Sequence, residues 1–595
     1  MFSLRRRLVG GDLLPRGQTP ENAEPVRLAP ISKISTKPRK GLKRLIFSLG
    51  GLFGIIMAGI FANHNDVINI NLDLLSDLNL DSFFDVIPAG IPKEARDISQ
   101  QERAAINFDS FSVGLHLYSQ GFRAHHPVVM IPGVISTGLE SWGTENKSRL
   151  YFRKRLWGSW TMMRALVMDR ESWKRHIVLD KHTGLDPPGI KLRAAQGFDA
   201  ADFFVTGYWI WSKILENLAT IGYDPTNSFT AAYDWRLSYS NLEVRDHYFT
   251  RLKVYIETSV RISGKKPVLV SHSMGSQVLF YFFHWVEAEG HGGGGPDWVE
   301  KHVDSWINIS GCMLGATKGL PAVLSGEMKD TAQLNAFAVY GLEKFLSREE
   351  RTDIFRAMPG ISSMLPKGGD AVWGNNTWAP DDRFGQEISY GNIINFKESN
   401  STRSEKNLTM RESMDYLLES SDSWYKDAVL ANYSHGIAHT ERDVEKKNER
   451  DPRKWTNPLE TRLPNAPSLK IYCFYGVGKQ TERSYFYREE QTPSRKSNMS
   501  IDTTVINGEV FSEGWKLKRF NPGGSKVKIF EMPHEPDRFS PRGGPNTGDH
   551  VDILGRQSLN DLILRVASGK GDLIEETVVS NIREYSDRVQ IFEEP

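Results

Sequence analysis

The segment Ser271-His-Ser-Met-Gly275 contains a serine where a sharp strand–turn–helix would expose a nucleophile. Ser273 follows the apolar run Lys266–Val270 and precedes a long apolar stretch. A nucleophile elbow needs small residues two positions before and two positions after the serine, because strand and helix come close there. Ser271, in place of the usual glycine, and Gly275 meet that requirement. We therefore predict that Ser273 is a catalytic nucleophile rather than an ordinary buried serine.

A serine nucleophile needs a base, and in chains with this elbow the histidine follows both the serine and the acid. Of the five histidines after residue 300, His534 and His550 lie near the predicted closing strand. His550 lies in a loop that leads into the final helix, and it is the predicted base. His534, in Met532-Pro-His-Glu-Pro536, is the other candidate, but we expect it to have a structural role at a strand end. The sequence leaves open that either is a plain surface residue.

Two backbone N–H groups are expected to bind the oxyanion that develops during acyl transfer. Met274 follows the nucleophile, and Val134 lies in the loop Gly133–Gly138 after the first core strand. A simple glycine turn is the alternative interpretation of that loop. The sequence contains no His-Glu-x-x-His and no paired-cysteine pattern, so we predict no metal and no cofactor. The run Gly292–Gly295 lacks the Gly-Lys-Ser/Thr of a phosphate-binding loop and predicts a linker.

Short buried strands that alternate with helices would position these groups. Apolar runs that predict strands occupy residues 127–133, 266–270, 306–310, 469–475 and 525–530. Helical spacing occupies residues 201–221, 243–262, 274–286 and 557–567. This alternation predicts an α/β protein with a mainly parallel, doubly wound sheet. The irregular residues from about 320 to 465 predict an inserted cap.

The N-terminal part of the chain differs from the remainder in charge. Residues 1–44 hold eleven basic and three acidic residues, a net charge of +8, which leaves 63 basic and 70 acidic residues, net −7, in the rest. This proline-containing stretch predicts a disordered tail. The net charge of the whole chain, +1, gives no indication of a nucleic-acid partner.

Residues 45–62 carry no charge and would span about 27 Å as a helix, enough for a thin bilayer. We predict a retained transmembrane helix rather than a buried core helix or a cleaved signal sequence. The positive-inside rule then places the tail in the cytosol and the rest across the membrane. Residues 63–110 would form a juxtamembrane connector, and residues 111–595 the catalytic domain.

Glycosylation and cysteine patterns bear on this topology. Seven Asn-x-Ser/Thr sequons follow the predicted span and are consistent with a lumenal glycoprotein: Asn146, Asn308, Asn375, Asn400, Asn407, Asn432 and Asn498. Cys312 and Cys473 are the only cysteines, and each lies in or beside an apolar run. One disulfide and two buried free thiols are both compatible with that placement.

Long motifs appear in a fixed order across residues 85–595, including Ile91-Pro-Lys-Glu-Ala-Arg96, Phe152-Arg-Lys-Arg-Leu-Trp-Gly158, Ala232-Tyr-Asp-Trp-Arg236, His272-Ser-Met-Gly275 and His550-Val-Asp-Ile-Leu-Gly555. With these motifs the chain resembles the fungal-type phospholipid:diacylglycerol acyltransferases, membrane-anchored relatives of lecithin:cholesterol acyltransferase. The resemblance implies an α/β-hydrolase-like domain with a cap.

The resemblance also implies a reaction and a location. Ser273, with His550 as base, would take the sn-2 acyl group of a phospholipid donor and pass it to a diacylglycerol acceptor without acyl-CoA. The enzyme would be single-pass in the endoplasmic reticulum membrane, with a lumenal active site at the bilayer.

The chain departs from the family where the family carries its catalytic aspartate. A Gly-Asp-Gly-Thr-Val-like segment is expected between Val505 and Trp515, and it is missing from this sequence. Asp502, Glu509 and Glu513 are nearby, but none matches the motif. The acid is therefore not assigned. A phospholipase A-type hydrolase on the same scaffold and a catalytically impaired lipid-binding relative stay open as alternatives.

Overall fold

The fold is given by a computed structural model. All the residues that it describes belong to one compact unit, residues 102–595. The described residues are 111–589 and 591, apart from 206–207, 328–345, 384, 386–388, 397–406, 447, 480, 491–497, 506–519 and 538–540. The predicted tail (1–44), transmembrane helix (45–62) and connector (63–110) lie outside them. Within the described ranges, no helix combines the length and the apolar character that crossing a membrane requires.

Six strands form a central sheet in which all five pairings are parallel. Their spatial order is β14 (Lys526–Pro533), β11 (Lys470–Val477), β9 (Ser305–Ile309), β8 (Val268–His272), β1 (Val128–Ile131) and β7 (Ser228–Thr230). This confirms the predicted α/β class and mainly parallel sheet. Five strands match the predicted runs. The edge strand β7 has no predicted counterpart, because Ser-Phe-Thr forms no apolar run.

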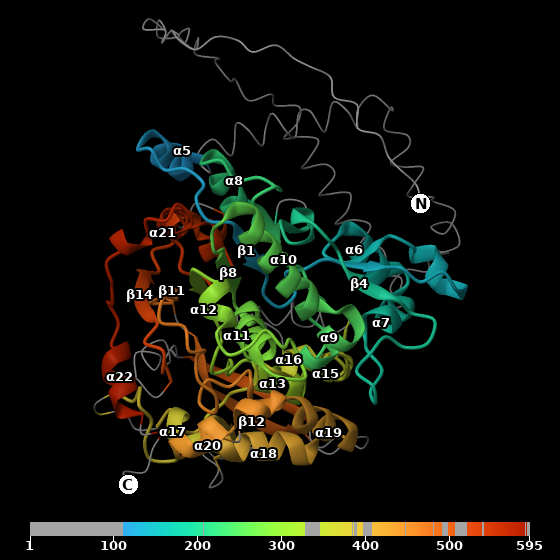
Figure 1. Cartoon of the computed structure of the whole chain (residues 1–595). Helices are drawn as coiled ribbons and strands as arrows, with labels where there is room; N and C mark the ends of the chain where they lie inside the picture. The colour runs from blue at the N-terminus through green and yellow to red at the C-terminus, as the bar shows by residue number, and fades with distance from the viewer. Residues whose placement is uncertain are drawn as a thin grey trace, which may run out of the picture. The chain divides into compact units, whose positions relative to one another are not determined.

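Helices cover both faces of this sheet (Figure 1). The main ones are α5 (Ser112–Ser119), α8 (Ser212–Thr220), α10 (Tyr248–Ser263), α11 (Met274–Glu287), α12 (Trp298–His302) and α21 (Gln557–Ala567). Successive strand side chains point to opposite faces. Val129 and Ile131 of β1 accordingly pack in one hydrophobic cluster with α10, α11 and α12. Val128 and Met130 pack in a second cluster with α5, α8 and α21.

Two of the predicted helices differ from the structure. Residues 201–221 begin with the hairpin β5 (Phe203–Val205) and β6 (Tyr208–Trp209), and only the last part forms α8. Aromatic and β-branched residues favour strands, which outweighs the helical spacing. Residues 243–262 belong to two helices, α9 (Tyr239–Asp246) and α10, which are separated by His247 at φ 48°.

An accessory region lies against the sheet domain and contains a second, three-stranded sheet of β10 (Ile394–Phe396), β12 (Glu482–Glu490) and β13 (Asn498–Val505). Its helices are α13 (Gly319–Ser325), α15 (Arg348–Arg356), α16 (Pro359–Ser362), α17 (Gly369–Trp373), α18 (Met410–Ser420), α19 (Ser423–Asn432) and α20 (Glu441–Lys446). Its buried hydrophobic cluster runs from Leu314 to Leu459 and then adds Tyr485 and Tyr487. The region therefore draws on chain from both sides of β11.

Most of the shorter elements follow β1 in the chain, before β7, and one lies near the C-terminus. They are β2 (Leu139–Ser141), β3 (Arg155–Trp157), β4 (Leu192–Ala194), α6 (Trp160–Met168), α7 (Arg170–Ile177) and α22 (Ile582–Arg588). The strands β3, β2 and β4 form a small antiparallel sheet in that order. This sheet directly follows the loop after β1, which matters for the site.

The structure bears on the predictions about cysteines and sequons. Cys312 and Cys473 are not joined in a disulfide, and only Cys473 is buried, whereas Cys312 is partly exposed. The thiol alternative is therefore confirmed, but one of the two thiols is not fully buried. Asn308 is only 6% exposed within β9, and its side-chain oxygen accepts a hydrogen bond from Ser276 Oγ at 2.8 Å. Glycosylation of Asn308 in the folded chain is therefore excluded. Asn375, in contrast, is exposed.

Candidate active site

Ser273 lies at the turn between β8 and α11, in a backbone conformation that a non-glycine residue rarely adopts. Its φ is 56° and its ψ is −127°. Strain of this kind persists only where the surroundings hold the backbone in place. The Ser273 N–H donates to the Ile309 carbonyl at 3.0 Å, which fixes the turn to β9. Ser273 is 4% exposed. This is the geometry that the sequence predicted for a nucleophile elbow.

The small residues around Ser273 are required by close packing. A Cβ on Gly275 would lie 2.5 Å from the carbonyl oxygens of both Ile131 and Pro132. Any side chain there would push the helix away from the loop after β1. Ser271 has room for its hydroxyl and uses it, since Ser271 Oγ accepts from Trp306 Nε1 at 2.8 Å. A serine in place of the usual glycine therefore fits this elbow.

His550 lies 277 positions away in the chain, yet its Nε2 is 2.8 Å from Ser273 Oγ. It follows β14 and precedes α21. The structure thus brings together Ser273 and His550, the two residues that the sequence predicted as nucleophile and base. A histidine nitrogen within hydrogen-bond distance of a serine hydroxyl can accept its proton.

The turn that carries His550 is held by two other histidines. His272 Nε2 lies 2.7 Å from the His550 carbonyl oxygen, which can only accept, so His272 must carry its proton on Nε2. Burial, followed by repulsion from His550, lowers the pKa of His272 to about 3. The Gly548 N–H donates to His534 Nδ1 at 2.9 Å. This hydrogen bond fits the structural role that the sequence predicted for His534.

The acid of a serine–histidine pair is not assigned by the described residues. Asp549 forms an ion pair with Lys479 and accepts from the Val551 N–H at 3.2 Å. Asp502 lies in β13 opposite Phe486 of β12. Glu509, Glu513 and the rest of residues 506–519 lie outside the described residues. The predicted loss of the family's aspartate segment falls in this range and stays a prediction.

The loop after β1 passes directly over the elbow. A Cβ on Gly133 would lie 3.0 Å from the Cβ of Ser273. Within the described part of the chain, neither the Val134 N–H nor the Met274 N–H has a hydrogen-bond acceptor. Two unused N–H groups near a nucleophile can stabilise an oxyanion. The loop therefore lies close to Ser273, where an oxyanion donor would be needed, and the role of both N–H groups stays a prediction.

The nearby cysteine does not compete with Ser273 as nucleophile. Gln277 Nε2 lies 3.7 Å from Cys312 Sγ. Burial raises the pKa of the Cys312 thiol to about 11. Because the thiolate is the reactive form, this thiol is inert near neutral pH.

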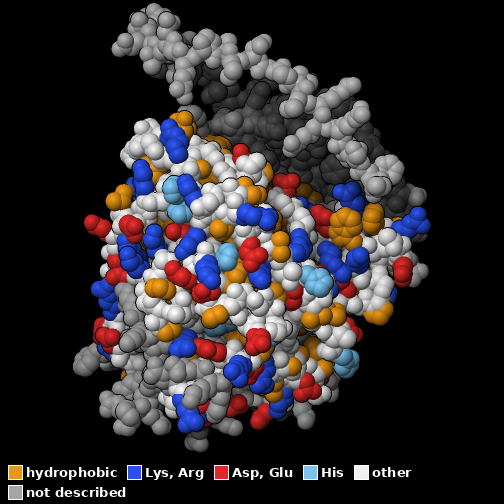
Figure 2. Space-filling model, viewed as in Figure 1, with side chains coloured by type: hydrophobic (Ala, Val, Ile, Leu, Met, Phe, Trp, Pro, Cys, Tyr) orange, Lys and Arg blue, Asp and Glu red, His pale blue; other side chains and the backbone are white. Residues whose placement is uncertain are grey.

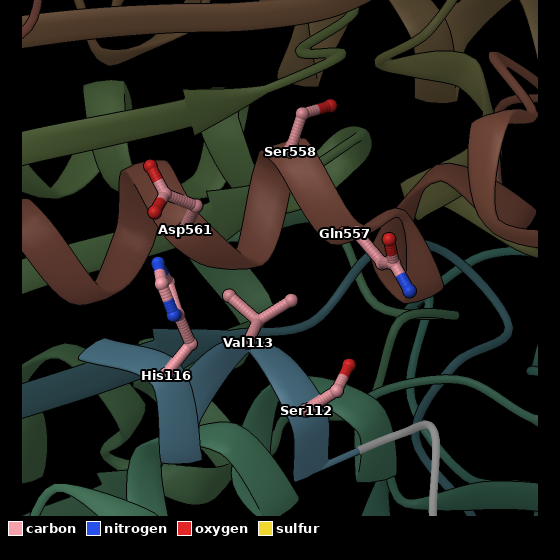
Figure 3. Close-up of a pocket in the computed structure, with 6 residues that line it drawn as sticks. All are labelled: Ser112, Val113, His116, Gln557, Ser558 and Asp561. Atoms are coloured by element: carbon pink, nitrogen blue, oxygen red, sulfur yellow. The ribbon is translucent and has the colours of Figure 1, made fainter. Parts of the chain in front are cut away.

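A shallow pocket elsewhere lies between α5 and α21 and is lined by Ser112, Val113, His116, Gln557, Ser558 and Asp561. Figure 3 shows the side chains of His116 and Asp561 directed toward each other from the two helices. Ser273 and His550 do not line it, so it is not part of the candidate active site. Among the described residues, no group of three or more His, Cys, Asp or Glu side chains could hold a metal ion.

Buried histidines make the free energy of unfolding depend on pH. Burial lowers the pKa of His284, and also of His435, to about 3. Below the unfolded value of about 6.5, the unfolded chain binds protons that the folded chain does not, so stability is lost as the pH falls from 6.5 toward 3. Each such histidine should contribute about 1.4 kcal/mol per pH unit. Burial raises the pKa of Asp202, and also of Glu287, to about 7, and these two carboxyl groups act in the opposite direction over the same pH range. The contribution of a single histidine is therefore measured as a difference between the wild type and a variant.

The variant His284→Phe tests this prediction, because it removes one titrating group and keeps an aromatic ring against Phe280. Its free energy of unfolding should depend less steeply on pH than that of the wild type, by one proton. An unchanged slope would contradict the assignment of His284 as a buried neutral imidazole.

The fold and the site define an α/β protein with a strained serine elbow and a histidine in contact with the serine hydroxyl. Sequence comparisons give the family. The sequence model of the family described as "Lecithin:cholesterol acyltransferase" matches residues 151–557. The chain therefore belongs to the lecithin:cholesterol acyltransferase family.

Curated relatives cover most of the chain. It is 48% identical to the phospholipid:diacylglycerol acyltransferase of Schizosaccharomyces pombe, over 97% of this chain and 96% of that protein. It is 46% identical to the protein of the same name from Saccharomyces cerevisiae, over 91% of this chain and 87% of that protein. Phospholipid:diacylglycerol acyltransferase 1 of Arabidopsis thaliana is 35% identical, over 80% of this chain and 86% of that protein.

Proposed function

We propose that this chain transfers a fatty acyl group from the sn-2 position of a phospholipid to diacylglycerol and forms lysophospholipid and triacylglycerol. The 2.8 Å contact between Ser273 Oγ and His550 Nε2 carries the proposal, because it provides an activated nucleophile. The substrates are suggested by relatives named phospholipid:diacylglycerol acyltransferase that match nearly the whole chain.

The proposed reaction has two balanced steps. Ser273 Oγ gives its proton to His550 Nε2 and attacks the ester carbonyl carbon of the phospholipid. The bond from that carbon to the glycerol oxygen breaks, and this oxygen takes the proton from His550 as the lysophospholipid leaves. The diacylglycerol hydroxyl then gives its proton to His550 and attacks the acyl-serine, and Ser273 recovers the proton. In both steps the N–H groups of Val134 and Met274 bind the oxyanion.

We also propose an α/β-hydrolase-like domain whose accessory region, with the cap at about 320–465, helps to exclude water. Transfer must be faster than hydrolysis of the acyl-serine, which requires a dry site that an apolar alcohol can enter. The strained elbow after a parallel strand supports the α/β-hydrolase-like assignment.

We propose further that the enzyme works at the endoplasmic reticulum membrane, with residues 45–62 as its single anchor, a cytosolic N-terminus and a lumenal catalytic domain. The uncharged run after a basic tail supports this topology. The outer face of α6 supports contact with lipid, since Trp160 is 63% exposed and Met168 58% exposed. Figure 2 shows hydrophobic side chains gathered where Figure 1 places α6, with Lys and Arg side chains beside them. Such a mixed surface suits an anionic lipid interface.

The full chain in detergent or in membranes should move label from sn-2-labelled phospholipid into triacylglycerol when diacylglycerol is present. Transfer should not need acyl-CoA. Label that appears only in free fatty acid, with or without diacylglycerol, would contradict transfer and favour the phospholipase alternative. Absence of both products, together with absence of covalent labelling of Ser273, would favour the impaired lipid-binding relative.

A further inference from the structure

The loop after β1 contains a second strained residue close to the elbow. Ile135 has φ 58°, and its side chain is 45% exposed. A β-branched residue in the left-handed region is a true outlier, because its side chain clashes with its own backbone. Such a conformation costs of order 1–3 kcal/mol and needs outside contacts to hold it. The exposed Ile135 side chain is not what holds the loop, so the contacts must be made by the backbone.

Three aromatic side chains provide those contacts by donating to carbonyls of this loop. Trp157 Nε1 donates to the Ile135 carbonyl at 2.8 Å. Tyr233 Oη donates to the Pro132 carbonyl at 2.9 Å, and Trp235 Nε1 donates to the Thr137 carbonyl at 3.2 Å. Of the three acceptors, only the Ile135 carbonyl belongs to the strained residue itself.

Trp157 is itself well fixed. It is the last residue of β3, and its ring lies 5.0 Å from that of Trp235 and 5.4 Å from that of Phe204, measured between centroids. A tryptophan packed between two other rings has few alternative rotamers, so its N–H is a rigid donor. The Ile135 carbonyl immediately follows Val134, whose N–H is one of the two proposed oxyanion donors.

We propose that Trp157 is a positioning residue for the oxyanion donor. Its indole N–H holds the Ile135 carbonyl and thereby keeps residues 133–136 in the strained conformation that places the Val134 N–H beside Ser273. This inference rests on the proposed function, since an oxyanion donor is needed only if Ser273 attacks an ester carbonyl. Without the bond, Ile135 should relax toward negative φ and turn the Val134 N–H away.

The test is the variant Trp157→Phe in the full chain, which removes the N–H donor and keeps an aromatic ring. A fluorophosphonate labels an activated serine through a transition state that also needs the oxyanion donors. The rate of Ser273 labelling, and kcat for acyl transfer, should fall about tenfold, as expected for one lost hydrogen bond. KM for phospholipid should change less than about twofold, because the bond serves the transition state.

The rescue variant Trp157→Phe with Ile135→Gly separates positioning from a merely structural role. Glycine adopts positive φ without strain, so the loop no longer needs the indole to hold it. The double variant should recover most of the lost labelling rate. Trp424→Phe is the matched control, since Trp424 Nε1 donates at 3.2 Å to Asp422 in the accessory region. It should label at the wild-type rate.

The inference would be overturned if Trp157→Phe were labelled at the wild-type rate. It would also be overturned if the double variant were labelled as slowly as Trp157→Phe alone. An equal loss in Trp424→Phe would overturn it too, because the effect would then not be specific to the loop. A wild-type chain that takes up the probe but forms no triacylglycerol would contradict the proposed function, whereas the labelling rates alone decide the role of Trp157.

Discussion

Replacement of Ser273 by alanine should lower acyl transfer by at least about 10⁴-fold, because the proposed reaction forms its acyl intermediate on the Ser273 hydroxyl. The folded state should persist, since the substitution removes one hydroxyl and leaves the hydrogen bond from the Ser273 N–H to Ile309 in place. The rate of triacylglycerol formation from phospholipid and diacylglycerol measures the effect. Covalent labelling by a fluorophosphonate should disappear together with transfer.

Ser276→Ala is the control for this prediction. Ser276 lies one helical turn further along α11, and its hydroxyl donates to Asn308 at 2.8 Å rather than facing His550. This variant should still take up the probe, which shows that labelling depends on Ser273 in particular. Transfer by Ser273→Ala within tenfold of the wild type would refute the nucleophile assignment.

Replacement of His550 by glutamine should also lower kcat about 10⁴-fold. The side-chain amide of glutamine is not a base, so it cannot accept the Ser273 proton as the imidazole does. The effect on the KM for phospholipid should be small, because the histidine acts on the reacting proton. Steady-state kinetics at fixed diacylglycerol gives both quantities.

His534→Gln discriminates between the two candidate bases. The glutamine side-chain oxygen can still accept from the Gly548 N–H, which His534 Nδ1 accepts at 2.9 Å. We expect a loss of at most about tenfold, the scale of one weakened hydrogen bond. Equal losses in His534→Gln and His550→Gln, or full activity of His550→Gln, would show that the base is not His550.

Local sequence signals predicted much of the framework. Continuous apolar runs gave five of the six central strands, because a strand buried on both faces of a parallel sheet is apolar throughout. The predicted helix 557–567 has the same bounds as α21. Spacing was misleading for residues 201–221, where aromatic residues form a hairpin, and for residues 243–262, where His247 ends one helix and begins the next.

For the site, the sequence located the elbow and favoured His550, but it could not tell what each neighbouring residue contacts. His272 and His534 are both close to key residues in the sequence, yet only the structure shows that they hold the turn that carries His550. Trp157 gave no signal of its own, because its partner is a backbone carbonyl 22 residues away. Asn308 fits the glycosylation motif, and only its burial in the structure excludes it as a glycosylation site.

By itself, the sequence determined what depends on neighbouring residues: the α/β class, the turn at Ser273 and the charge contrast between residues 1–44 and the rest. The tertiary structure alone decided what depends on distant chain meeting in space. It brought His550 to Ser273 across 277 positions, and it placed the Trp157 indole under a strained loop. Periodicity and turn chemistry act over a few residues, whereas packing selects among the long-range contacts that a sequence allows.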